Sequence, residues 1–166
     1  MEINRIWAMP NKWTFTIKPI KELIEKYHKG IWCDPFAGKN SPAKVTNDLT
    51  EFADFNMDAL DFLKLQKTND YDGAFYDPPY SITQAREYGA KRYASMKYWA
   101  DCKNELARII KPNGIAICCG CSSQGLGKNR SFVIVEILLV PHGGSKNDTI
   151  VTVERKINDP RPNRNL

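Results

Sequence analysis

The residues FYDPPYS, at positions 75 to 81, place an acid, two prolines and an aromatic ring directly after an apolar run. Prolines lack a backbone N–H and fix φ, so they end the strand that the preceding residues predict. They also hold the backbone so that the Asp77 carboxylate and a proline carbonyl can point at one spot, while Tyr80 offers a flat face for stacking. Two acceptors and a stacking platform suit a planar substrate that carries an NH2 group. Hydrogen bonds accepted from both N–H groups would free the nitrogen lone pair for attack. A rigid surface turn is the alternative interpretation.

Two further acids follow predicted strands, Asp34 in GIWCDPF and Asp48 in AKVTNDL. Ligands of parallel α/β sheets bind outside the carboxyl ends of the strands, where these acids and Asp77 would meet. Carboxylates are costly to bury unless they are hydrogen-bonded, so three at one sheet edge predict a site. The turn after Asp34 contains Gly38, and on its own it could be a plain structural turn. Asp58 begins MDALDFL and is predicted to cap that helix.

The elements that position these acids alternate along the chain. Helices are predicted in KPIKELIEKYHKG, in MDALDFLKL, with Ala59, Leu60, Leu63 and Leu65 on its buried side, and in SMKYWADCKNELARII, which the turn KPNG closes. Strands are predicted in GIWCDPF, AKVTNDL, YDGAFYD, GIAICCG, SFVIVEILLVP and TIVTVERKI, the last two joined by a turn-rich connection. This order predicts an α/β fold with a mostly parallel twisted sheet and a C-terminal antiparallel β-hairpin.

The composition is that of an ordinary globular chain, with 166 residues, 42% of them hydrophobic and 26% charged. We expect one domain, no signal peptide and no membrane span, and therefore a cytoplasmic protein. The five cysteines are expected to be reduced, and their spacing does not predict a metal site. The net charge of +5 is compatible with a nucleic-acid partner.

DPFAG followed some forty residues later by DPPY resembles the amino-methyltransferases of DNA, which use S-adenosylmethionine. DPPY is most typical of their adenine-N6 members. The opening RIWAMPNKWTFTIKPI resembles that of small methyltransferases encoded by phages and prophages, and the similarity runs over nearly the whole chain. The resemblance implies a Rossmann-like class I methyltransferase fold. It also implies methyl transfer from S-adenosylmethionine to the N6 amine of an adenine that is flipped out of duplex DNA.

The resemblance also implies roles for individual residues. The catalytic motif would be Asp77, Pro78, Pro79 and Tyr80, with Asp77 and the Pro78 carbonyl holding the target amine. The cofactor would contact Asp34, Phe36 and Gly38 in the first loop, Asp48 at its ribose, Asp58 near its adenine, and Phe15, Thr16 and Lys18 in an N-terminal element. The first loop reads FAGKN where the family pattern is FxGxG, so Asn40 replaces a glycine.

Family members carry a separate target-recognition region, for which this chain has no room. We therefore expect residues 1–166 to form a single catalytic domain, with a loose tail at 157–166. DNA contacts are expected from the loop 81–95, through Arg86, Tyr88, Lys91 and Arg92, and the basic segment 122–130 is a second candidate. An exposed polar connection is the alternative for the first loop. Recognition of the target DNA sequence could also depend on a second subunit, in a homodimer or in a complex with a partner protein.

Two other functions stay open. DPPY-like motifs also occur in enzymes that methylate amines of RNA bases, so an RNA base N-methyltransferase is one alternative. The other alternative is a non-catalytic module that binds S-adenosylmethionine or nucleic acid. The missing recognition region and Asn40 in the first loop are the reasons to consider it.

Overall fold

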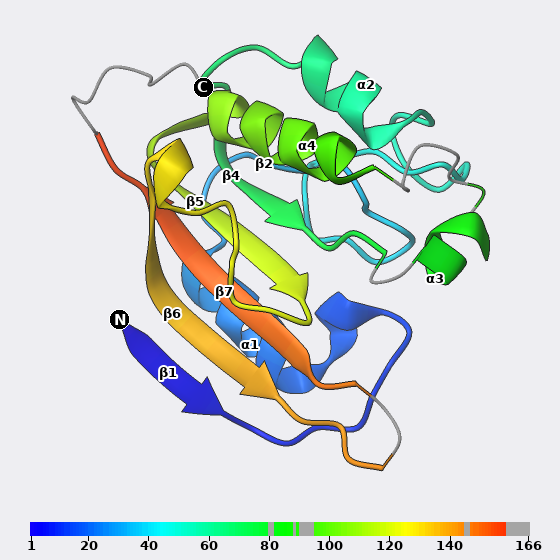
Figure 1. Ribbon diagram of the computed structural model, residues 1–166, viewed down its shortest axis with the longest axis vertical. Coiled ribbons are helices and arrows are strands. Elements are labelled where there is room, and N and C mark those ends of the chain that lie inside the picture. The colour runs from blue at the N-terminus through cyan, green and yellow to red at the C-terminus, as the bar shows by residue number, and fades with distance from the viewer. Residues whose placement is uncertain (80–81, 88, 90–94, 145–146, 159–166) are drawn as a thin grey trace.

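A computed structural model describes residues 1–79, 82–87, 89, 95–144 and 147–158. The described residues form a single sheet of seven strands in the order β1-β6-β7-β5-β4-β2-β3 (Figure 1). The strands are β1 (Glu2–Arg5), β2 (Trp32–Asp34), β3 (Val45–Thr46), β4 (Tyr71–Tyr76), β5 (Ile110–Gly120), β6 (Phe132–Val140) and β7 (Thr149–Lys156). The helices are α1 (Lys18–Tyr27), α2 (Ala59–Leu65), α3 (Ile82–Glu87) and α4 (Met96–Ile109), with the 3-10 turns η1 (Thr14–Thr16) and η2 (Lys128–Arg130).

The pairing of the strands confirms the predicted sheet. β2 pairs in parallel with β3 and β4, β4 with β5, and β1 with β6, whereas β7 is antiparallel to both β5 and β6. From β2 the chain goes first to β3 on one side and later to β4 on the other, so the strand order reverses between β2 and β4. A crevice at such a reversal is where open α/β sheets bind their ligands.

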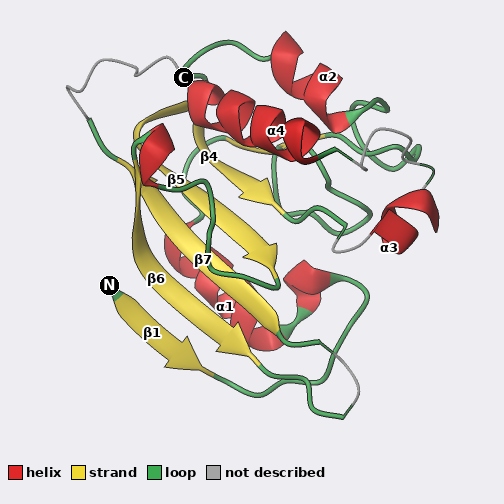
Figure 2. Ribbon diagram, in the orientation of Figure 1, coloured by secondary structure: helices red, strands yellow, loops and turns green. Residues whose placement is uncertain are grey.

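Alternating side chains of the strands fill two cores, one on each face of the sheet. Trp32 and Phe75 point to the face that α1 covers, whereas their neighbours Cys33 and Ala74 point to the face covered by α2 and α4. In Figures 1 and 2, α1 lies behind β6 and β7. The spacing that predicts α1 is confirmed, because its apolar positions Ile20, Leu23 and Ile24 are buried.

Several sequence expectations need correction. Leu65 was expected on the buried side of α2 but is 65% exposed, whereas Phe62, which was not expected there, is buried together with the predicted Ala59, Leu60 and Leu63. The predicted loop 81–95 contains the helix α3. KPNG is not a separate turn after α4: it lies within β5, where Asn113 has φ of 66° and the pairing with β4 shifts register. β1 was not predicted at all.

Among the described residues, no helix has the length and apolar character needed to cross a bilayer. All five cysteines are free; Cys121 is exposed, and the other four are buried.

Candidate active site

A pocket of about 520 Å³ opens at the carboxyl ends of β2, β3 and β4, where the strand order reverses. Three loops that follow these strands line it, at residues 35–40, 47–50 and 77–79. Its remaining described lining consists of Lys12, Trp13, Thr14, Phe15, Phe52, Met57, Ala59 and Glu87. The three predicted acid-bearing loops therefore surround one pocket.

Asp34 lies beneath the first of these loops and is fully buried. Its Oδ1 accepts a hydrogen bond from the Phe36 N–H (2.9 Å) and its Oδ2 from the Ser41 hydroxyl (2.6 Å). The pKa of Asp34 is raised to about 7, chiefly by burial and also by the nearby charges of Asp77 and Asp48, although the two hydrogen bonds lower it. Asp34 is not among the residues that line the pocket, and its contacts are those of a group that fixes the turn above it.

Asp48 lines the pocket and holds the same turn from the other side. One carboxylate oxygen accepts from the Gly38 N–H (3.0 Å), and the other accepts from the Thr50 N–H (2.9 Å) and hydroxyl (2.7 Å). A carboxylate has about four acceptor positions, so these three hydrogen bonds leave capacity for a ligand hydroxyl. Gly38 has φ of 52°, which favours glycine at this point of the turn.

Asn47, which the sequence analysis did not identify, ties the pocket walls together. Its side chain is buried and donates to the carbonyls of Pro35 (3.1 Å) and Met57 (3.0 Å). Its backbone N–H donates to the Asp34 carbonyl (2.8 Å), and its own carbonyl accepts from the Ala37 N–H (2.9 Å). The signal in the sequence was an amide at the end of a predicted strand, immediately before the acid that drew attention.

Aromatic and apolar side chains form the walls of the pocket. Phe15 packs on Phe75, with ring centroids 4.9 Å apart, and Phe36 meets Tyr76 edge to face at 5.7 Å. At the rim, the Lys39 ammonium lies 4.8 Å from the Phe52 ring centroid. This combination of apolar walls with a few polar groups is typical of small-molecule sites.

Asp77, Pro78 and Pro79 follow β4 and line the pocket, each of them half-buried. Asp48 and Asp77 both line this pocket, and their charges raise the pKa of the buried Asp34. Tyr80, the last residue of the predicted catalytic motif, lies outside the described residues.

The other predicted cofactor residues differ in their placement. Phe15 lines the pocket, but the exposed Thr16 donates its hydroxyl to the Trp13 carbonyl (2.8 Å), and Lys18 forms an exposed ion pair with Glu22 (4.0 Å). Thr16 and Lys18 are not among the lining residues.

Asp58 caps α2 as predicted, because its side chain accepts from the Leu60 N–H (3.0 Å). The Tyr98 hydroxyl also donates to it (3.2 Å). The pocket is lined by its neighbours Met57 and Ala59 rather than by Asp58 itself.

The predicted DNA-contacting residues fall mostly outside the described part of the chain. Arg86 lies in α3, whereas Tyr88, Lys91 and Arg92 lie outside the described residues. In the second basic segment, Arg130 donates to the Leu126 carbonyl (2.8 Å) and the Asn104 side chain (2.7 Å), so its guanidinium attaches this segment to α4.

Comparison with models of known protein families gives no match to the chain, and neither does comparison with curated protein sequences. Solved structures do match. TrmN from Thermus thermophilus has a TM-score of 0.57 and 16% identity over 84% of this chain and 48% of its own. The 1,6-didemethyltoxoflavin-N1-methyltransferase of Burkholderia thailandensis, solved with S-adenosylhomocysteine, has a TM-score of 0.55 and 14% identity over 77% of this chain and 71% of its own. The N-methyltransferase NodS of Bradyrhizobium japonicum has a TM-score of 0.53 and 9% identity over 85% of this chain and 93% of its own.

The chain has the class I methyltransferase fold. With identities this low, the likeness establishes the fold alone. Within this fold, the reversal of strand order and the acids after β2, β3 and β4 make the pocket the candidate active site.

Proposed function

We propose that this protein is an S-adenosylmethionine-dependent methyltransferase that modifies the N6 amine of adenine in DNA. The observation that carries the proposal is the shared pocket. Asp77 and Pro78 of DPPY line the same cavity as Asp48 and the loop that contains Gly38, at the strand reversal of a methyltransferase fold. The activity of the structural neighbours supports the reaction class, and the DPPY motif supports the amine substrate.

The described residues fit S-adenosylmethionine. The remaining acceptor capacity of Asp48 suits a ribose hydroxyl, and the apolar side chains of Phe36, Leu49 and Met57 suit a purine ring. A volume of about 520 Å³ lies within the usual range for sites of this size. When bound, the cofactor supplies an electrophilic methyl group to the nucleophilic amine.

The chain itself has to prepare the amine. The amine of adenine is a weak nucleophile because its lone pair is delocalised into the ring. In the proposed complex, the Asp77 carboxylate and the Pro78 carbonyl accept one hydrogen bond each from the two N–H groups, which favours a pyramidal nitrogen. The two prolines keep both acceptors in place before the base arrives, so positioning supplies much of the rate enhancement. Once the N–C bond has formed, the nitrogen loses a proton, for which Asp77 is the adjacent acceptor.

A base in a duplex cannot reach this pocket while it is stacked, so the target adenine would be flipped out. In the proposal, the segment around Arg86, Tyr88, Lys91 and Arg92 contacts the DNA strand. The net charge of +5 suits a polyanionic partner.

Transfer of a labelled methyl group tests the proposal. We expect purified protein to transfer label from S-adenosylmethionine to duplex DNA at low salt. Asp77→Asn removes the charge that polarises the amine but keeps the size, and it should lower the transfer rate at least about 100-fold.

The matched control is Asp70→Asn, the same change at the exposed opposite end of β4. It should leave the rate within about twofold. Cofactor affinity, measured by calorimetry, should be similar for both variants. Label that enters only RNA would refute the choice of DNA, and cofactor binding without transfer to any nucleic acid would favour a non-catalytic module.

A further inference from the structure

The edge strand β1 presents an unpaired row of backbone groups. The N–H of Ile6 donates to the Leu139 carbonyl (3.0 Å) and that of Ala8 to the Pro141 carbonyl (3.2 Å). Even-numbered residues of this segment therefore bond toward β6, and by alternation the N–H and C=O groups of Ile3, Arg5 and Trp7 point away from the sheet. No described strand covers this outer side of β1 (Figure 1).

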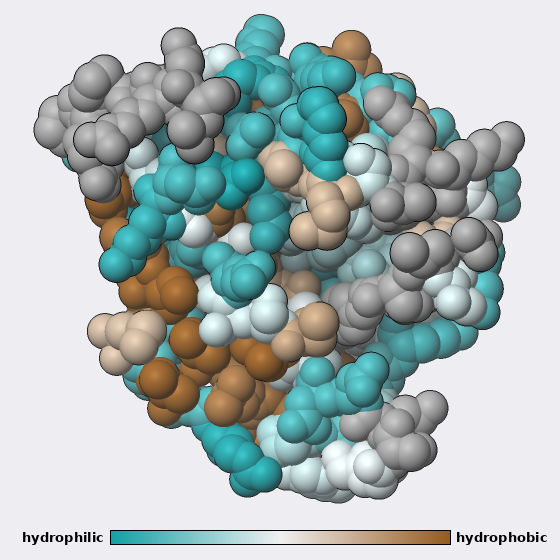
Figure 3. Space-filling view, in the orientation of Figure 1, coloured by the Kyte–Doolittle hydropathy of each residue, from teal (hydrophilic) through white to brown (hydrophobic). Residues whose placement is uncertain are grey.

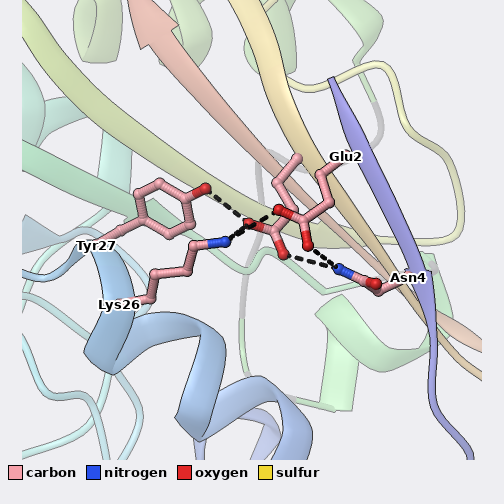
Figure 4. A network of polar contacts seen from close by, with 5 residues as sticks. Glu2, Asn4, Lys26 and Tyr27 are labelled. Carbon is pink, nitrogen blue, oxygen red and sulfur yellow. Dashed lines mark hydrogen bonds and ion pairs between the residues drawn. The ribbon is translucent and has the colours of Figure 1, made fainter.

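The strand is held firmly in this position by a buried acid on β6. Glu136 accepts hydrogen bonds from the Tyr27 hydroxyl (2.6 Å), the Lys26 ammonium (2.7 Å) and the Asn4 side chain (3.1 Å). Lys26 also pairs with Glu2 at 3.2 Å. Figure 4 shows these groups joining β1 to α1. The outer edge is thus preformed, and pairing with it would cost little ordering of the chain.

Exposed apolar side chains concentrate on the same segment. Five of the exposed large hydrophobic residues fall within the first nine positions: Met1, Ile3, Ile6, Trp7 and Met9, with exposed fractions between 47% and 77%. On the face opposite α1, Ile3 pairs with Ile137 of β6, and the half-buried Leu139 and Ile150 pair with each other next along β6 and β7. Figure 3 shows apolar surface over β1 and β6 on this face. No described helix covers it.

Sheet edges that stay unpaired are usually protected by short strands, proline, bulges or charges at the edge. The opposite edge has such protection, because β3 is only two residues long and Asn47 after it bridges to Phe55. β1 is longer, with four residues, and has no proline or bulge; the charge of Glu2 is turned toward Lys26, which leaves Arg5 as its other charged residue.

We propose that β1 is the contact surface for a second copy of this chain, which pairs antiparallel with it across a two-fold axis and joins the two sheets. A two-fold contact requires a self-complementary surface, and a preformed apolar edge meets that requirement. This inference is independent of the proposed catalytic activity, because β1 contributes no lining residue to the pocket.

The charges favour one register. With the axis at Asn4, Ile3 of each copy exchanges two backbone hydrogen bonds with Arg5 of the second copy, and Met1 lies opposite Trp7 of the second copy. No like charges then face each other, and both apolar ends are covered. A shift of the axis to Arg5 would instead place the Arg5 side chains of the two copies opposite each other, which like charges disfavour.

Sedimentation equilibrium tests this proposal. At a chain concentration on the order of 50 µM, which reveals any dimer with a Kd in the low micromolar range, the mass should be twice 19.0 kDa. The double variant Ile3→Lys, Arg5→Pro places a charge on the edge and removes an outward N–H without breaking a bond to β6, so it should sediment as a monomer.

The matched control is Leu65→Lys, which puts the same charge at a 65% exposed leucine on α2 and should remain dimeric. Circular dichroism checks that the double variant is folded. If it is not folded, the sedimentation experiment uses the single variant Ile3→Lys instead. Hydrogen exchange at the Ile3 and Arg5 amides should also slow as the wild-type concentration rises. A wild-type monomer at 50 µM, or a dimer that survives both edge substitutions, would overturn the proposal.

Discussion

The acid at the end of β2 acts on the pocket without lining it. Asp34 is fully buried, and its two oxygens hold the Phe36 N–H and the Ser41 hydroxyl. The environment that makes these bonds strong also excludes water, and so it disfavours the charge of the carboxylate. Asp34 therefore shapes the loop that carries Gly38, at a cost in stability when it ionises.

This cost predicts a pH dependence. The pKa of Asp34 is raised from its ordinary 3.8 to about 7 in the folded chain. Between about pH 4 and pH 7 the folded state keeps a proton that the unfolded state has lost, so the free energy of unfolding should fall as pH rises through this window and level off above it. Asp34→Asn removes the charge, and its amide can still accept from Phe36 and donate to Ser41.

We expect urea unfolding from pH 4 to pH 8 to show this difference. Relative to the wild type, Asp34→Asn should gain stability as pH rises, by an amount on the order of 2–4 kcal/mol. Because the other carboxyl groups are the same in both proteins, the difference isolates Asp34. Parallel profiles for the two proteins would show that Asp34 titrates as an ordinary carboxyl group.

At the scale of elements, the crevice depends on how closely β4 approaches β2. Gly73 of β4 stands beside Trp32 of β2, and the buried indole lies where a side chain of residue 73 would be. A Cβ at Gly73 would meet the Trp32 ring at 2.3 Å. The ring cannot easily move, since its N–H donates to the Lys29 carbonyl (2.9 Å) and its face packs on Phe75.

Gly73→Ala should therefore destabilise the protein by about 1–3 kcal/mol through overpacking, as measured by thermal or chemical unfolding. Gly120→Ala is the control, because a Cβ there would meet nothing nearer than the Ser122 nitrogen at 4.0 Å. That change should stay within about 0.5 kcal/mol. Equal effects at both glycines would mean that strand propensity, not the indole, sets the cost.

The sequence predicted the elements with local signals and missed those that depend on distant partners. The amphipathic spacing of α1 and the apolar runs of β4 and β5 are local, and the structure confirms them. β1 has a single apolar residue, the exposed Ile3, and owes its conformation to pairing with β6, more than 130 residues away. Leu65 was misplaced because α2 ends at that residue, so the helical spacing no longer positions it.

The same contrast applies to the site. Acids at strand ends could be found because parallel strands end at one edge, and in the structure Asp48 and Asp77 line one pocket there, with Asp34 buried beneath its first loop. Asn47 could not be found, because its partners Pro35 and Met57 are defined only by the folded loops.

At the scale of the whole molecule, the two proposals concern opposite parts of the sheet. The pocket lies at the reversal of strand order between β2 and β4, and the edge strand β1 lies at the far end of the strand order. A two-fold dimer through β1 would leave both pockets free and would join two basic chains, each with a net charge of +5. Such a dimer would offer a longer contact surface to DNA than a single chain does.

The central claim is that the DPPY pocket methylates the N6 amine of adenine, and the identity of the product tests it most directly. DNA incubated with the protein and S-adenosylmethionine would be digested to nucleosides and analysed by mass spectrometry. We predict N6-methyl-2′-deoxyadenosine with the wild type and with Asp70→Asn, and none above background with Asp77→Asn. Methylation of another base, or undiminished N6-methyl-2′-deoxyadenosine with Asp77→Asn, would contradict the account.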